Sequence, residues 1–274
     1  MPQTRAKQKS STKSASRIDG RKNGLDILAF GTHPDDLEIA CGGTLIALAR
    51  KGYRVGAADL TRGERGTRGS AALRARETAA ATTVLGLSLR VNLGIPDGNI
   101  ELSQENLMAV IRLLREHRPR LVFAPYWLER HYDHVHASQL VSEAAFYSGL
   151  AKIETDEAAF RPFRILYYMS RIEFKPSFVV DISDTFADRT KALQCYRSQF
   201  HQENSAPRAQ EAETMISTPL ALEVFETMTR YYGAMIGARH GEPFVVREAL
   251  EINDPVDFFR AFPDSRQAHL FPPP

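Results

Sequence analysis

Two short polar clusters hold most of the residues in this chain that could do chemistry. The first, at residues 33–36, reads His-Pro-Asp-Asp and follows a short apolar run. His33 and Asp36 stand three residues apart where a strand is expected to turn into a helix, so both side chains can face one point. Asp35 points in a different direction, so one carboxylate can bind a metal ion while its neighbour acts as a base. The alternative is that one of these carboxylates only caps the helix, as Asp often does, but capping accounts for neither the other carboxylate nor His33.

The second cluster, at residues 131–136, reads His-Tyr-Asp-His-Val-His. It supplies His131 and His134 with Asp133 between them, and the alternative is a solvated loop whose histidines are incidental. His136 is expected at the surface, since it lies one helical residue beyond the motif. A functional role for this cluster is favoured because it follows a predicted strand, as the first cluster does.

Together the two clusters predict a metal site. His33, Asp36 and one distal histidine would supply three ligands and leave a fourth position for water, which is the pattern of catalytic zinc. Histidine and carboxylate ligands suit zinc, although iron, manganese or cobalt could substitute. The two cysteines, Cys41 and Cys195, are too few for a cysteine zinc cluster or a disulfide framework, and they fit a reducing compartment such as the cytoplasm.

The elements that must position these clusters alternate between strand and helix. Apolar runs predict strands over 25–31, 54–60, 89–94, 120–126, 164–170, 177–182 and 243–249. Helical spacing predicts helices over 36–51, 72–85, 103–117, 135–148, 184–199 and 219–237. Successive strand–helix units predict a three-layer αβα, Rossmann-like fold with a mostly parallel sheet. In such sheets ligands bind outside the carboxyl ends of the strands, where both clusters fall.

Composition excludes several classes of protein. The 274 residues are 43% hydrophobic and 25% charged, ordinary values for a globular protein, and no apolar run is long enough to span a membrane. The net charge of +2 divides into +6 for residues 1–23 and −4 for the remainder. We expect residues 1–23 to be a disordered basic leader, the alternatives being a targeting peptide or a contact with anionic partners. Residues 24–265 are expected to form one domain and residues 266–274 a tail, with no nucleic-acid partner because the body has no basic stripe interleaved with aromatics.

Two further segments bear on the interpretation. Residues 42–44, Gly-Gly-Thr, lie inside the first predicted helix and lack the lysine of a phosphate-binding loop, so close helix packing is the favoured reason for the glycines. Residues 201–214 are polar and irregular and are a candidate mobile loop over the site.

The clusters resemble those of a known family, the LmbE/PIG-L type of zinc-dependent N-acetylglucosaminyl deacetylases. The resemblance covers almost all of residues 25–250 and rests first on residues 33–38, His-Pro-Asp-Asp-Leu-Glu, with the distal Asp133-His134. Further segments resemble the bacillithiol-biosynthesis branch, whose substrate is N-acetylglucosaminyl malate. They are residues 59–64, 66–69, 92–98, 177–183 and 196–200.

The resemblance implies a role for each matching position. His33, Asp36 and His134 match the family's ligands for one zinc ion per chain. Asp35 matches its general base, and His131 matches the histidine that helps stabilise the tetrahedral intermediate, with Asp133 orienting it. The reaction expected from the resemblance is hydrolysis of an N-acetyl group to acetate and a free amine. The alternative is a metal-dependent amidase or deacetylase acting on another acetylated amino sugar or small amide.

Arg74 matches an arginine that reaches the substrate, and it could fork onto a carboxylate such as those of malate. A surface salt bridge with Glu77 is the alternative for Arg74. The chain departs from the family at Tyr132, where the family's distal motif usually has proline, so the loop conformation and the fit of substrate are the properties most affected. The resemblance also implies a small-molecule substrate, no membrane partner, and a homo-oligomer, possibly a hexamer.

Overall fold

A seven-stranded sheet lies at the centre of the computed structural model, which describes residues 24–201 and 212–260. The strands are β1 (Ile27–Gly31), β2 (Val55–Asp59), β3 (Leu89–Asn92), β4 (Leu121–Pro125), β5 (Arg164–Tyr168), β6 (Phe178–Asp181) and β7 (Gly241–Val245). Their order across the sheet is β3-β2-β1-β4-β5-β7-β6. Neighbours from β3 to β5 are parallel, and β7 runs antiparallel to both β5 and β6. The sheet is therefore mostly parallel, as predicted.

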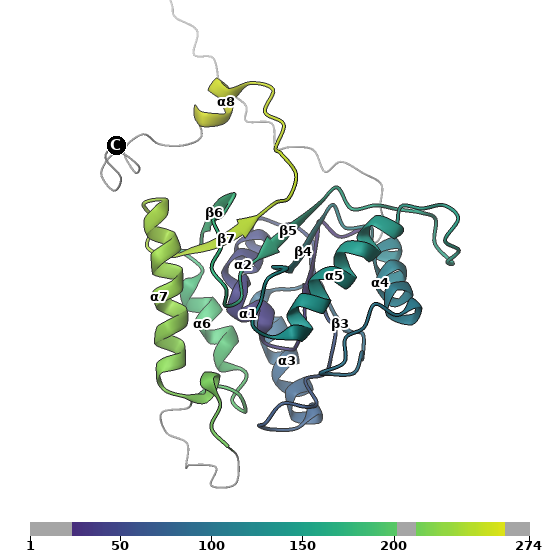
Figure 1. Ribbon diagram of the computed structural model, residues 1–274. Helices are drawn as coiled ribbons and strands as arrows, with labels where there is room; N and C mark the ends of the chain where they lie inside the picture. The colour runs from purple at the N-terminus through teal and green to yellow at the C-terminus, as the bar shows by residue number, and fades with distance from the viewer. Residues whose placement is uncertain (1–23, 202–211, 261–274) are drawn as a thin grey trace, which may run out of the picture.

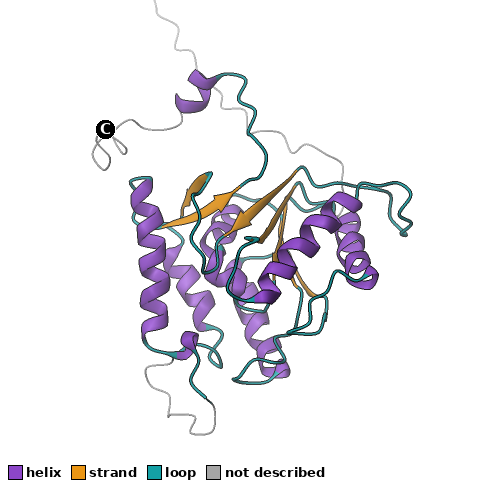
Figure 2. Cartoon of the chain, in the orientation of Figure 1, coloured by secondary structure: helices purple, strands orange, loops and turns teal. Residues whose placement is uncertain are grey.

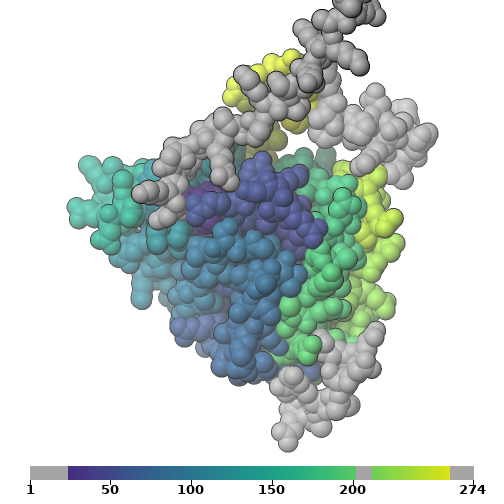
Figure 3. All heavy atoms as spheres, turned by 180° about the vertical axis from the view of Figure 1, so that it is seen from behind, coloured from purple at the N-terminus to yellow at the C-terminus, as the bar shows by residue number. Residues whose placement is uncertain are grey.

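Helices cover both faces of this sheet, which confirms the predicted three-layer αβα fold (Figures 1 and 2). The helices are α1 (Asp36–Ala40), α2 (Gly42–Arg50), α3 (Ala71–Leu85), α4 (Gln104–His117), α5 (Tyr132–Tyr147), α6 (Phe186–Gln194), α7 (Leu220–Met235) and α8 (Pro255–Arg260), with a short 3₁₀ helix, η1 (Met215–Ser217). One face is covered by α4 and α5, and α1 and α2 cover the other, where α3 and α6 pack beside α2. Figure 3 shows this second face, formed largely by α2, α3 and α6.

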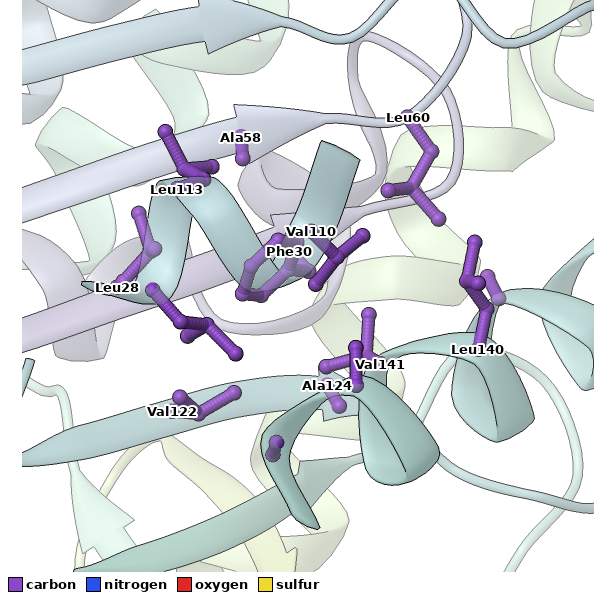
Figure 4. Packing of buried hydrophobic residues seen from close by; sticks show 14 of the residues in the cluster. Leu28, Phe30, Ala58, Leu60, Val110, Leu113, Val122, Ala124, Leu140 and Val141 are labelled. Carbon is purple, nitrogen blue, oxygen red and sulfur yellow. The ribbon is translucent and has the colours of Figure 1, made fainter. Parts of the chain in front are cut away.

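The core follows from the alternation of side chains along the central strands. Leu28 and Phe30 of β1 point toward α4 and α5, where they meet Val110 and Val141 (Figure 4). Ala29, between them in sequence, faces the opposite layer with Leu37 and Leu45. Both faces of β1 are thus buried, which explains its continuous apolar sequence.

The order of the strands places the two polar clusters side by side. The chain passes from β1 to β2 and β3 on one side, then returns to β4 on the other side of β1. The carboxyl ends of β1 and β4 therefore flank a switch point, where open α/β sheets form a ligand crevice. Residues 33–36 follow β1 and residues 131–134 follow β4, so the predicted meeting of the clusters at one sheet edge is confirmed.

The single helix predicted over 36–51 is wrong, because the segment forms two helices. Cys41 between them is not helical, with φ −146° and ψ 16°. This break frees the backbone N–H groups of Gly43 and Thr44, which donate to Glu242 Oε1 at 2.9 Å and Oε2 at 2.7 Å. The residues Gly42–Thr44 therefore open α2 rather than lying inside a longer helix. Glu242, which caps the start of the second helix, comes from β7, so local sequence patterns do not reveal it.

Close packing does account for Gly43, as predicted. A Cβ atom at this position would lie 2.8 Å from Ile182 Cδ1, too close for any larger side chain without movement. Cys41 is fully buried, and His136 is exposed, as predicted.

Other element boundaries also differ from the prediction. α5 begins at Tyr132, three residues before the predicted start at 135, so the distal cluster opens the helix instead of preceding it. α6 ends at Gln194 rather than 199, and the last strand is shifted to 241–245. The sequence patterns predict neither η1 nor α8.

Several predictions lie outside the described residues. They concern the leader at 1–23, the tail at 266–274 and most of the loop at 201–214. Over residues 24–201 and 212–260, no helix has both the length and the apolar character that crossing a bilayer requires.

Candidate metal centre and its cleft

The turn after β1 sets the geometry of the first cluster. The N–H of His33 donates to Asp36 Oδ2 at 2.7 Å, which folds the two side chains toward each other. Asp35 has φ 111° and ψ −22°, a conformation rare for residues other than glycine. Its side chain makes no cap hydrogen bond with α1, so simple helix capping does not explain this residue. Backbone strain of this kind is typical of functional sites, where the surrounding structure enforces it.

Three side chains from the two clusters converge as candidate metal ligands. The ligand atoms of His33, Asp36 and His134 lie within 4.8 Å of one another. Asp36 Oδ2 is 3.4 Å from His33 Nδ1 and 3.3 Å from His134 Nε2. Ligands of tetrahedral zinc with bonds of about 2.0–2.1 Å stand about 3.3–3.4 Å apart. The donor set of two imidazoles and one carboxylate therefore fits zinc with an open fourth position.

Each histidine of this trio has a further polar partner that the sequence analysis does not identify. His33 Nε2 lies 3.0 Å from Asp97 Oδ1, and His134 Nδ1 lies 3.3 Å from Ser170 Oγ. Asp97 belongs to the loop after β3, and Ser170 follows β5. Residue type alone could have flagged Asp97, since it stands in the Pro-Asp-Gly segment that supports the family resemblance, whereas nothing in the sequence singles out Ser170.

The protonation states of His33, Asp36 and His134 depend on one another. Burial alone would lower the pKa of His33, but its contacts with Asp133, Asp36 and Asp97 raise it well above 6.5. Burial would raise the pKa of Asp36, but His134 and His33 lower it by more, so this carboxylate stays ionised. Burial lowers the pKa of His134 and favours its neutral form. Asp36 and His134 therefore favour the ionised carboxylate and the neutral imidazole that bind metal, whereas His33 would release a proton on metal binding.

Asp35 sits beside the trio with Arg74 as its neighbour. Arg74 Nη1 lies 3.4 Å from Asp35 Oδ2 and donates to the carbonyl oxygen of Pro34 at 2.9 Å. Burial raises the pKa of Asp35 to about 7, although Arg74 acts in the opposite direction. A carboxylate poised near neutral pH can accept and return a proton.

The alternative salt bridge between Arg74 and Glu77 is not formed. The carboxylate of Glu77 accepts hydrogen bonds from the N–H and Oγ of Ser198, at 2.7 Å and 2.6 Å. Arg74 is buried and lines the cleft, where its guanidinium faces Asp35.

His131 and Asp133 also lie close to His33. The ring centroids of His131 and His33 are 5.1 Å apart, and His131 is exposed to the cleft. The N–H of Asp133 donates to His131 Nδ1 at 3.2 Å, whereas its carboxylate accepts from the N–H of Gly98 at 2.6 Å. The same carboxylate is 3.7 Å from His33 Nε2. The orienting role of the Asp133 carboxylate toward His131 stays a prediction.

The trio lies in a cleft of about 550 Å³ with a basic rim. Arg65, Arg130 and Arg171 line it, and among the described residues none of their guanidinium groups forms an ion pair. Burial and the nearby charge of Arg130 lower the pKa of Arg171. Glu129 is close, but its two carboxylate oxygens accept from the backbone N–H groups of Arg130 and Arg171. The rim is therefore suited to an anionic group.

Tyr132, the departure from the family motif, opens α5 with its side chain 79% exposed. His134 still reaches Asp36, so the substitution leaves the trio assembled.

Comparison with known proteins gives a consistent result. Residues 28–145 match the family model PIG-L, described as GlcNAc-PI de-N-acetylase. The diacetylchitobiose deacetylase of Thermococcus kodakarensis is 29% identical over 232 residues, which is 79% of this chain and 80% of that protein.

Two solved structures share the fold over most of the chain. The conserved protein TT1542 from Thermus thermophilus is 38% identical, with a TM-score of 0.75 over 84% of this chain and 98% of the other. The N,N'-diacetylchitobiose deacetylase from Pyrococcus horikoshii is 28% identical, with a TM-score of 0.69 over 82% of this chain and 84% of the other.

Proposed function

This chain belongs to the PIG-L family, and from that membership and the geometry of its cleft we propose that it is a metal-dependent deacetylase. Its substrate is a conjugate of N-acetylglucosamine, and its products are acetate and the free amino sugar. The observation that carries the proposal is the convergence of His33, Asp36 and His134 beside Asp35, a buried carboxylate whose pKa is about 7.

One zinc ion per chain is the proposed cofactor, held by His33, Asp36 and His134. Zinc supplies Lewis acidity, which polarises an acyl oxygen and lowers the pKa of a coordinated water molecule to about 7. Iron, manganese or cobalt could occupy the same ligands.

Residues next to the proposed metal ligands carry out the proton transfers and stabilise the developing charge. Asp35 accepts the proton of the attacking water and delivers it to the leaving nitrogen, a task for which a pKa near neutral is well matched. Arg74 holds the carboxylate of Asp35 in place from 3.4 Å. His131, which is exposed to the cleft beside His33, donates to the oxygen that becomes negatively charged as the amide carbonyl is attacked.

The conjugate that we propose is N-acetylglucosaminyl malate, the substrate of the bacillithiol branch. Malate carries two carboxylates, and the rim supplies Arg65, Arg130 and Arg171, whose guanidinium groups have no ion-pair partner within the described part of the chain. Guanidinium groups bind carboxylates through paired hydrogen bonds. Arg74, the substrate contact expected from the resemblance, lines the same cleft and directs Nη1 toward Asp35 and the carbonyl of Pro34. We keep it as a further candidate contact for a substrate carboxylate.

A neutral chitin-derived sugar is the second candidate substrate. It is favoured by the names of the two archaeal relatives, both diacetylchitobiose deacetylases. The cleft of about 550 Å³ also has apolar lining from Ile39, Met215 and Ile216, against which a sugar ring can pack.

Acetate release from metal-depleted and zinc-reconstituted protein tests both proposals. The substrates are N-acetylglucosaminyl malate, diacetylchitobiose and free N-acetylglucosamine at matched concentrations. We expect activity only after zinc is restored, with the highest kcat/KM for the malate conjugate. A higher kcat/KM for diacetylchitobiose would reject the malate assignment alone, and no acetate release from any acetylated sugar would reject the deacetylase.

A further inference from the structure

The imidazole of His33 presents its two nitrogens to different neighbours. Nδ1 faces the proposed metal centre, 3.4 Å from Asp36 Oδ2. Nε2 faces the loop after β3, 3.0 Å from Asp97 Oδ1. Both His33 and Asp97 are largely buried, so water does not easily replace this contact.

We propose that Asp97 is a positioning residue of the metal centre, which accepts a hydrogen bond from the Nε2–H group of His33 and so leaves Nδ1 free to bind the metal ion. A neutral imidazole carries one proton, and only the nitrogen without it can coordinate a metal. An ionised carboxylate can accept a hydrogen bond but not donate one, so Asp97 fixes the proton on the nitrogen that it contacts. A carboxylate behind a metal-binding histidine also orients the ring and raises its basicity. The inference rests on the proposed metal centre and adds a residue to it.

Asp97 is itself held in position by its surroundings. Its second carboxylate oxygen accepts from the N–H of Arg65 at 2.8 Å, and its own N–H donates to Glu64 Oε1 at 2.9 Å. The loop after β2 therefore fixes both the backbone and the carboxylate of Asp97. A carboxylate held in one position can in turn hold the ring of His33 in one orientation.

A second carboxylate near Nε2, that of Asp133, is the weaker candidate for this role. It is 3.7 Å from Nε2, beyond hydrogen-bond distance, and it accepts from the N–H of Gly98 at 2.6 Å. Asp133 thus contributes negative charge near the ring, whereas Asp97 makes the directional contact.

The affinity for zinc and the position of the imidazole proton test the proposal. Asp97→Ala removes both carboxylate oxygens. Asp97→Asn keeps the shape of the side chain, but its amide has one oxygen acceptor, whereas the carboxylate accepts from both His33 Nε2 and the N–H of Arg65. Asp26→Asn is the matched control, because that carboxylate also accepts from a backbone N–H, that of Arg54 at 2.9 Å, but precedes β1 at the other end of the strand. Zinc Kd is measured by competition with a chelating dye, and the His33 tautomer by long-range ¹H–¹⁵N NMR of the zinc-loaded protein, with His33→Gln for assignment.

We expect Asp97→Ala to weaken zinc binding about 10- to 100-fold, the range seen for such outer partners. Asp97→Asn should show a smaller loss, and Asp26→Asn should match the wild type. In the wild type the His33 proton should reside on Nε2. The proposal is overturned if a folded Asp97 variant binds zinc with wild-type affinity, or if the wild-type proton resides on Nδ1. Should Asp97→Ala not fold, the Asp97→Asn affinity and the wild-type tautomer decide. Neither measurement uses a substrate, so failure of the deacetylase assay would not be mistaken for failure of this inference.

Discussion

The guanidinium of Arg74 lies 3.4 Å from the carboxylate of Asp35, and both side chains are less than a tenth exposed. The contact ties α3 to the turn after β1, since Arg74 also donates to the carbonyl of Pro34. Its electrostatic effect opposes that of burial: burial favours the protonated carboxylic acid, and the neighbouring cation favours the carboxylate. The pKa of the proposed base is thus raised by burial and moderated by a residue 39 positions away in the sequence.

Arg74→Gln should move the acidic limb of the pH profile of kcat/KM to higher pH. Removing the cation raises the pKa of Asp35, and a base works only when deprotonated, so more alkaline solution is needed. Arg74→Lys keeps the charge and should leave the limb close to that of the wild type. The measurement is acetate release from pH 5 to about 9. If the acidic limb of Arg74→Gln lies at the wild-type pH, Arg74 does not affect the pKa of the base.

Asp35→Asn should keep the metal and lose activity by about 10²- to 10⁴-fold, the usual contribution of a general base. The amide is nearly isosteric, and Asp35 is not one of the three converging ligands. Asp36→Asn is the contrasting variant, since it weakens a ligand and should lose both metal and turnover. Elemental analysis of the purified variants, beside the acetate assay, distinguishes the two. Full activity in Asp35→Asn would remove this residue from the mechanism.

Arg130→Gln should raise KM for the malate conjugate about 10-fold or more and leave KM for diacetylchitobiose nearly unchanged. A charged hydrogen bond contributes about 1.5–3 kcal/mol, and 1.4 kcal/mol corresponds to a factor of ten. Arg76→Gln, an exposed arginine of α3 that does not line the cleft, is the matched control. Equal effects on the charged and the neutral substrate would argue against a carboxylate contact at the rim.

Arg115→Met should destabilise the fold without directly affecting the chemistry. The buried guanidinium donates to the carbonyls of Ser148, Leu150 and Ile153, which hold the segment after α5. Losing these donors leaves several acceptors without partners, a cost of about 3 kcal/mol or more in the free energy of unfolding. Arg112→Met, an exposed change on the same helix, should stay within about 0.5 kcal/mol of the wild type. Urea unfolding of the three proteins provides the comparison.

Local patterns in the sequence predict the strands of the sheet and the convergence of His33, Asp36 and His134 well. The apolar run of β1 identifies a buried strand, and the polar residues that directly follow it must lie at the sheet edge. His33 and Asp36 are fixed by a turn of four residues, so their proximity follows from the sequence. His134 joins them because β4 pairs directly with β1.

Contacts between distant segments account for most of what the patterns miss. Asp97 reaches His33 across 64 residues, and Ser170 reaches His134 across 36. The Pro-Asp-Gly segment draws attention to Asp97 but does not say which residue it contacts, and Ser170 carries no local signal at all. The antiparallel insertion of β7 between β5 and β6 is equally invisible to strand patterns, which carry no information on strand order.

The hydrogen bonds from Gly43 and Thr44 to Glu242 also bear on the order in which the molecule matures. The amino end of α2 is separated from the turn that supplies His33 and Asp36 only by the short helix α1, yet the carboxylate partner of Thr44 is 198 residues further along the chain. During synthesis the first ligands therefore leave the ribosome long before the residue that secures the helix next to them. We expect the start of α2 to reach its final form only after β7 has entered the sheet, so the segment next to His33 and Asp36 is completed late in folding.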